Sequence, residues 1–123
     1  MRTRVLLVDD QVLILKIAKA FLEGTYEVIT ASSGDEALAK AAEVRPDVIV
    51  TDFNMPGRNG VETAQRLQQD ARTRSIPVVI MTTESEAPRI PQGFDLLCKP
   101  FVAPTLLSVV AAQVRRPAAR RAA

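Results

Sequence analysis

Hydrophobic and polar positions follow two alternating periods along the chain, and these periods predict strands and helices in regular succession. Residues 5–8 and 48–50 are continuously apolar, which is typical of strands covered on both faces of a sheet. Five strands are predicted in all, at residues 4–8, 26–31, 47–52, 76–82 and 93–98. Apolar residues three or four apart predict helices at residues 11–23, 34–44, 60–71 and 104–115.

Strands that alternate with helices indicate βαβ units with right-handed crossovers. The predicted fold class is therefore α/β, a doubly wound parallel sheet with helices on both faces. A chain of 123 residues suits one domain, which we place at residues 1–115. Residues 116–123 contain three arginines and no acid, and we expect them to form a basic, flexible tail.

The helix boundaries and faces carry further predictions. Two pairs have the spacing of helix N-terminal caps, Ser33 with Glu36 and Asn59 with Glu62. The expected core face of the first helix includes Leu13, Ile17 and Phe21.

One segment does not fit the regular alternation. About eleven residues separate the fourth and fifth strands, which is near the minimum for a helical crossover. Pro88 and Pro91 lie within this segment, and an interior proline costs a helix about 3 kcal/mol. We therefore expect a short or missing fourth helix at residues 84–92.

Composition excludes several kinds of site. Histidine is absent, which excludes histidine metal sites, histidine-based triads and histidine proton relays. The single Cys98 cannot form an internal disulfide, which favours a reducing, cytoplasmic setting, and we expect it to be a small buried residue. We find no signal peptide, and no apolar run approaches the roughly 20 residues of a membrane span.

The net charge of +2 hides an uneven distribution. Four of the 16 basic residues lie in the last nine positions, so 12 basic and 14 acidic residues remain in the body of the chain. That body carries a charge of −2, whereas a nucleic-acid-binding domain usually presents a basic face. We therefore do not expect direct nucleic-acid binding.

The residues that could carry chemistry follow the predicted strands. All carboxyl ends of a parallel sheet lie at one edge, where doubly wound folds bind ligands. This edge would collect Asp9, Asp10, Asp52, Thr82 and Lys99. Carboxylates that lie close together need a cation, and oxygen ligands favour a hard one such as Mg²⁺. Together these groups could hold a transferring phosphoryl group on an attacking carboxylate.

Each of these residues also has a simpler explanation. Asp9 and Asp10 could form a solvated turn and helix cap, and Asp52 could start a turn. Thr82 could be an ordinary strand-end hydroxyl, and Lys99 could be a surface lysine. Their joint placement at the ends of four strands favours the shared site.

The motifs that contain these residues resemble the receiver domain of two-component response regulators. The resemblance covers residues 4–115. It rests on Val8-Asp9-Asp10, Asp52-Phe53-Asn54-Met55-Pro56-Gly57 with Asn59-Gly60, Met81-Thr82, and Cys98-Lys99-Pro100-Phe101.

The resemblance implies a CheY-like five-stranded sheet of order 2-1-3-4-5 and a role for each motif residue. Asp52 would accept a phosphoryl group from a histidine kinase or a histidine phosphotransfer protein. Asp10, Asp52 and the backbone carbonyl of Asn54 would bind Mg²⁺, with Mn²⁺ as an alternative metal, and Asp9 would act through water. Lys99 would pair with the phosphoryl oxygens.

Further roles implied by the resemblance concern switching and decay of the phosphorylated state. Thr82 would turn to hydrogen-bond the phosphoryl group. Asn54 and Glu84, two residues after Asp52 and Thr82, would tune dephosphorylation because they flank the route of an attacking water molecule. Leu96 stands where the family often has an aromatic residue, and residues 84–92 replace the usual fourth helix, so we do not expect the family's usual output surface.

We therefore expect a stand-alone cytoplasmic switch with slow autodephosphorylation rather than a true enzyme. It would bind an unidentified downstream protein or relay phosphate onward, without membrane contact. Two alternatives stay open. One is a phosphohydrolase with an aspartyl-phosphate intermediate, although the usual second acid is absent because Asn54 follows Asp52 by two. The other is an interaction module that does not use phosphate.

Overall fold

Five short aliphatic segments form the strands of one parallel sheet in the computed structural model, which describes residues 2–115. The strands are β1 (Arg4–Val8), β2 (Glu27–Ala31), β3 (Val48–Asp52), β4 (Val78–Thr82) and β5 (Asp95–Cys98). Their spatial order is β2-β1-β3-β4-β5, and every neighbouring pair is parallel. The predicted α/β fold class and strand order are confirmed.

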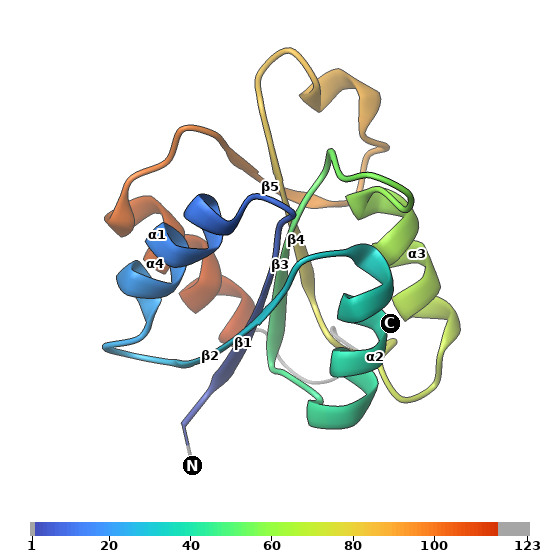
Figure 1. Cartoon of the computed structure of the whole chain (residues 1–123), viewed down its shortest axis with the longest axis horizontal. Coiled ribbons are helices and arrows are strands. Elements are labelled where there is room, and N and C mark those ends of the chain that lie inside the picture. Colours follow the sequence, from blue (N-terminus) through green and yellow to red (C-terminus); the bar gives the residue numbers. More distant parts are fainter. Residues whose placement is uncertain (1, 116–123) are drawn as a thin grey trace.

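Within residues 2–115, four α-helices cover the two faces of the sheet. They are α1 (Val12–Leu22), α2 (Gly34–Val44), α3 (Gly60–Gln69) and α4 (Ala103–Val114). In Figure 1, α1 and α4 lie together on one side of the strands, and α2 and α3 lie together on the other. Alternate strand residues serve the two layers: Leu7 and Val50 pack toward α1 and α4, whereas Leu6 and Ile49 pack toward α2 and α3.

Side-chain caps fix where α2 and α3 begin. The Ser33 hydroxyl accepts a hydrogen bond from the backbone N–H of Glu36 at 3.1 Å. Asn59 and Glu62 form a complete reciprocal capping box, with both hydrogen bonds at 2.9 Å. Both predicted caps are confirmed, and such a cap contributes about 1 kcal/mol to helix stability. The second cap also fixes the turn that follows β3.

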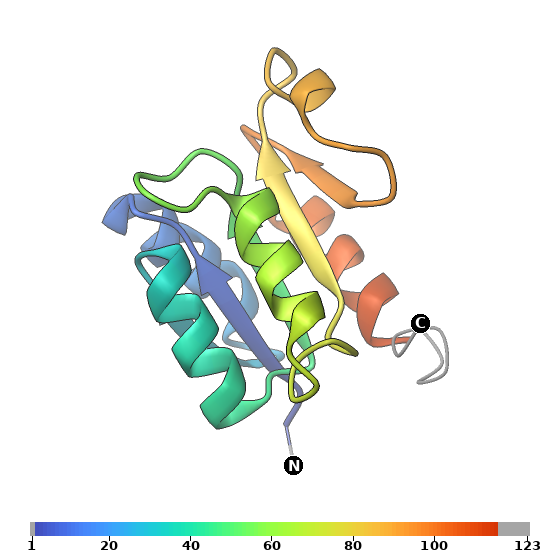
Figure 2. The ribbon, with the colours of Figure 1, turned by 90° about the vertical axis from the view of Figure 1, so that its right-hand side faces the viewer.

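The segment between β4 and β5 contains one 3₁₀ turn, η1 (Ala87–Arg89), in place of an α-helix. Figure 2 shows it arching beyond the carboxyl end of β4 before the chain returns through β5. Ile90 anchors the segment, because it is only 8% exposed and packs in a small cluster with Phe53 and Ile80. The prediction that the helix between the fourth and fifth strands is short or missing is confirmed.

Two predictions about side-chain burial are wrong. Leu13 and Ile17 are 67% and 40% exposed, and Ala18 and Leu22 are the buried residues of α1. Apolar residues occur on all sides of this helix, so its sequence does not define which face meets the sheet. Cys98 is exposed because it ends the edge strand β5, in which Leu97 is the residue that turns toward the core.

Candidate functional site

The carboxyl ends of β1, β3, β4 and β5 bring the predicted site residues to one edge of the sheet. Register pairs Val8 with Thr51, Asp52 with Met81, and Thr82 with Cys98. Successive strands therefore end at nearly the same level, and the residues that follow β1 and β5 lie beside the last residue of β3. This alignment is why residues more than forty positions apart in the sequence share one site.

Lys99 joins two of the acids at this edge. Its ammonium nitrogen Nζ lies 2.9 Å from Asp52 Oδ1 and 3.1 Å from Asp9 Oδ2. Asp9 is fully buried, and its Oδ1 accepts a hydrogen bond from the backbone N–H of Gln11. The side chain of Asp9 is thus held in place, and it can position the lysine beside Asp52.

The third acid, Asp10, is exposed and completes the cluster. Carboxylate oxygens of Asp9, Asp10 and Asp52 lie within 4.8 Å of one another. Three carboxylates at this spacing carry a charge of −3, and Lys99 neutralises only part of it. The arrangement offers oxygen ligands for a further cation on the exposed side of the cluster.

Burial and charge shift the pKa values of the two central groups. Burial raises the pKa of Asp52; the hydrogen bond from Lys99 opposes this rise, and the nearby negative charges of Asp9 and Asp10 add to it. Burial lowers the pKa of Lys99, but its hydrogen bonds and charge interactions with Asp52 and Asp9 outweigh burial and raise it overall. Lys99 therefore stays positively charged at neutral pH, as a partner for a negative group at Asp52.

Thr82 is only 1% exposed and ends β4 beside this cluster. Its hydroxyl donates to the backbone carbonyl of Thr83 at 3.3 Å, so it is turned toward its own backbone. The same carbonyl accepts the N–H groups of Glu86 and Ala87, at 3.1 and 2.9 Å. A rotation of the Thr82 hydroxyl would thus remove one of the three hydrogen bonds that the Thr83 carbonyl accepts, at the start of residues 83–90.

The other two predicted site residues, Asn54 and Glu84, lie on the rim. Both are exposed, one in the turn after β3 and one at the start of the segment after β4. They flank the edge at which Asp52 lies and do not belong to its ion-paired cluster.

Our sequence reasoning did not assign a role to Gly60, the first residue of α3. A β-carbon at this position would lie 2.4 Å from the backbone oxygen of Asp52. The N–H of Gly60 also donates to the carbonyl of Phe53 at 2.8 Å. The end of β3 is therefore pressed directly against the start of α3, and glycine allows this close approach. Only the motif pair Asn59-Gly60 hinted at such a constraint.

Comparisons with known proteins agree with this geometry. A family model described as the response regulator receiver domain matches residues 5–111. The chain belongs to this family. Receiver domains of two-component response regulators are phosphoacceptors in signalling, and this is the functional class of the protein.

Individual relatives show the same relationship. PilH of Pseudomonas aeruginosa is 37% identical over 113 residues, which cover 87% of this chain and 93% of that protein. The transcriptional regulatory protein ResD of Bacillus subtilis is 33% identical over 93% of this chain, but this chain spans only 49% of ResD. Among solved structures, the chemotaxis protein CheY4 of Vibrio cholerae has a TM-score of 0.81 at 34% identity, covering 91% of this chain and 98% of CheY4.

A membrane-spanning helix needs about 20 consecutive, predominantly apolar residues. Within residues 2–115, no helix is both long enough and apolar enough to cross a bilayer.

Proposed function

We propose that Asp52 is the residue that accepts the phosphoryl group, from a histidine kinase or a histidine phosphotransfer protein. The observation that carries this proposal is the contact of Lys99 with both Asp52 and Asp9 at the edge of the sheet. Asp52 is 6% exposed, so it is sheltered from bulk solvent but not sealed from a donor. Asp9 and Asp10, the other acids of the cluster, would take part in metal binding.

The acids fit a divalent metal ion. Asp10, Asp52 and the backbone carbonyl of Asn54 would hold it, and Asp9 would act through water. The donors are all oxygens, which suits Mg²⁺, with Mn²⁺ as an alternative. The receiver domain of a sensor histidine kinase from Pseudomonas aeruginosa, 23% identical to this chain, contains magnesium in its active site cleft. When bound, such an ion supplies positive charge that stabilises the transferring phosphoryl group.

In the transfer itself, a carboxylate oxygen of Asp52 attacks the phosphorus of the donor phosphohistidine. The new O–P bond forms as the P–N bond breaks, and the imidazole nitrogen keeps the electron pair. Lys99 lies beside the attacking carboxylate, where its charge stabilises the phosphoryl oxygens. The Thr82 hydroxyl then exchanges the Thr83 carbonyl for a phosphoryl oxygen, which is a stronger, charged acceptor.

An apolar patch beside the cluster supports a protein donor rather than a small molecule alone. Val12, Leu13 and Ile17 of α1 are 61%, 67% and 40% exposed, and Val102 is 61% exposed. Val12, Leu13 and Ile17 come soon after Asp10 in the sequence, and Val102 comes soon after Lys99. Exposed apolar side chains gathered on one helix, as on α1, are a candidate interaction surface. A donor protein docked there would present its phosphohistidine to Asp52.

The route by which the signal leaves the site differs from the usual one. Leu96 is aliphatic and 38% exposed, and residues 84–92 form no α-helix that a partner protein could contact. We propose that the segment from Thr83 to Ile90 responds instead, because its first turn shares the Thr83 carbonyl with the Thr82 hydroxyl. The switch would act in the cytoplasm on a protein target or on a further phosphotransfer step.

We propose that loss of the phosphoryl group is slow and is tuned by Asn54 and Glu84. Both side chains are exposed at the rim, on the path of a water molecule that approaches Asp52 from solvent. A phosphohydrolase would need a general acid next to its nucleophile. Asn54 cannot donate a proton in this way, so we favour a switch over an enzyme.

The test is intact-protein mass spectrometry after incubation with a small acyl phosphate and Mg²⁺. We expect one added phosphoryl group on the wild type and none on Asp52→Asn, which keeps the size of the side chain. Asp35→Asn removes another exposed acid, in the first turn of α2, and should leave phosphorylation intact. An unmodified wild type, or equal modification of wild type and Asp52→Asn, would contradict the proposal.

A further inference from the structure

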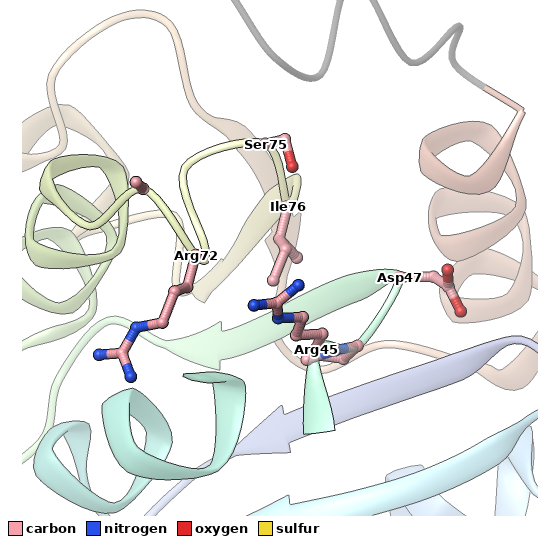
Figure 3. A pocket seen from close by; sticks show the side chains of 7 residues that line it. Arg45, Asp47, Arg72, Ser75 and Ile76 are labelled. Atoms are coloured by element: carbon pink, nitrogen blue, oxygen red, sulfur yellow. The ribbon is translucent and has the colours of Figure 1, made fainter. Parts of the chain in front are cut away.

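A groove at the opposite edge of the sheet has no role in phosphoryl transfer. It consists of two adjoining hollows of about 440 and 760 Å³, which share Ala71 and Arg72. Figure 3 shows the first hollow, between the residues that precede β3 and the loop that follows α3. The second continues between α2 and α3. We call the whole surface the arginine groove, and it is defined by the residues that follow.

The arginine groove has an apolar floor and a charged rim. Its floor includes Leu38, Ala42 and Leu67 on one side and Ile76 on the other. Its rim carries three arginines, Arg45, Arg66 and Arg72. The lining also contains two acids, Asp47 and Asp70, and the uncharged polar residues Gln69, Thr73 and Ser75.

Two of the three arginines are available to a ligand. Arg72 is occupied by Asp70, through contacts of 3.1 Å from Nε and 2.8 Å from Nη2. Arg72 and, more weakly, Arg45 hold the pKa of Asp70 at about 2. The guanidinium groups of Arg45 and Arg66 make no hydrogen bond or ion pair with any residue between 2 and 115.

The remaining acid of the groove does not compete for these arginines. An oxygen of Asp47 accepts the backbone N–H of Arg4 at 2.8 Å, and Figure 3 shows the Asp47 side chain pointing away from Arg45 and Arg72. Arg45 also adopts a left-handed backbone conformation with φ of 48°, which is unusual for a residue with a side chain. Its side chain thereby leaves the end of α2 at the mouth of the first hollow.

We propose that the arginine groove binds an acidic, amphipathic segment of a partner protein. The apolar floor would take aliphatic side chains, and Arg45 and Arg66 would each pair with a carboxylate. Arginine suits this task because its planar guanidinium pairs with a carboxylate through two parallel hydrogen bonds. The groove is open to solvent along its length, which suits a peptide better than a small molecule that must be enclosed.

Such binding would be independent of the phosphorylation state. The arginine groove lies at the amino edge of β3 and β4, whereas Asp52 is at the carboxyl edge of β3. A partner held in the groove would leave Asp52, Lys99 and the patch on α1 free for the phosphodonor. The groove would therefore serve to localise the switch.

The test measures fluorescence anisotropy of a labelled glutamate-rich peptide with leucines at helical spacing. We compare wild type with the double variant Arg45→Gln and Arg66→Gln, which removes both charges and keeps side-chain length. Losing two charge pairs should weaken binding roughly tenfold. Arg74→Gln removes an exposed arginine that does not line the groove and should bind like wild type. Asp52→Asn should also bind like wild type.

Three results would overturn the proposal: no saturable binding to the wild type, equal binding of the double variant and the wild type, or equal binding of a peptide with lysine in place of glutamate. The result for Asp52→Asn separates this proposal from the phosphoacceptor role, because groove binding does not require Asp52. Circular dichroism of each variant confirms that a loss of binding does not arise from unfolding.

Discussion

The carboxylate cluster should cost the protein stability when no metal is present. Asp10 is exposed and makes no hydrogen bond or ion pair with Lys99, so it adds repulsion to the site without a direct partner. Replacing Asp10 with asparagine keeps the shape of the side chain and removes one negative charge. We therefore expect Asp10→Asn to unfold at a higher temperature than wild type in metal-free buffer.

The size of this effect follows from the geometry. At 4.8 Å, the upper limit for the separation of these carboxylate oxygens, two like charges repel by about 0.9 kcal/mol in water and about 3.5 kcal/mol at an effective dielectric constant of about 20. Asp10 faces Asp9 and Asp52, but Lys99 offsets part of their charge. Because Asp10 is exposed, the low end applies, and we expect a net gain of about 1 kcal/mol. For a domain of this size, that corresponds to roughly 3–5 °C in melting temperature.

Metal binding should reverse the order of the two proteins. At a Mg²⁺ concentration about 100 times the dissociation constant, the wild type gains about 2.7 kcal/mol, and Asp10→Asn should lose most of this gain. The assay is thermal unfolding at low ionic strength, with a chelator and then with excess Mg²⁺. Glu43→Gln, an exposed acid on α2 outside the cluster, should respond to Mg²⁺ like wild type. A lower metal-free melting temperature for Asp10→Asn, or an equal Mg²⁺ shift in both proteins, would refute the reasoning.

Three other predictions concern packing and titration. Gly60→Ala should destabilise the fold by about 1–3 kcal/mol in denaturant unfolding, because the new methyl group would meet the Asp52 backbone; Gly24→Ala, with no atom within 4 Å of the added carbon, should not show this loss. The folded-state pKa of Asp52 is raised, so its protonated form stabilises the metal-free fold. This stabilisation is fully present below pH 3.8 and is lost as the pH rises through the folded-state pKa. Asp52→Asn should remove that part of the pH dependence of unfolding. The carboxyl group of Asp70 should titrate near pH 2 by NMR and return toward 3.8 in Arg72→Gln, and an unchanged value would contradict the Arg72 contact.

The fold and the gathering of the acids could be predicted from the sequence because parallel strands impose a common edge. Val8 and Asp52 end apolar runs, and any parallel sheet built from those runs brings Asp9 close to Asp52. The spacing of Asn59 and Glu62 likewise determines a helix start locally, without knowledge of the rest of the fold. Pro88 and Pro91 predicted the missing helix for an equally local reason.

Other features depend on tertiary packing and could not be predicted. The rotation of α1 is set by how Ala18 and Leu22 meet α4 and the sheet, and apolar residues around the whole helix conceal that choice. The close approach of Gly60 to Asp52 depends on the angle between β3 and α3. The arginine groove joins Arg45, which follows α2, and Arg66 of α3, and nothing in their sequence spacing connects them.

The central claim is that Asp52 is the phosphorylated residue. The direct measurement is to phosphorylate the wild type with a small acyl phosphate and Mg²⁺, and then reduce the acyl phosphate with borohydride. This reduction converts a phosphorylated aspartate to homoserine, which tandem mass spectrometry locates in the sequence. We predict homoserine at position 52 and at none of the other acids of the cluster. Homoserine at position 9 or 10, or at no position in a protein that carries phosphate, would contradict the claim.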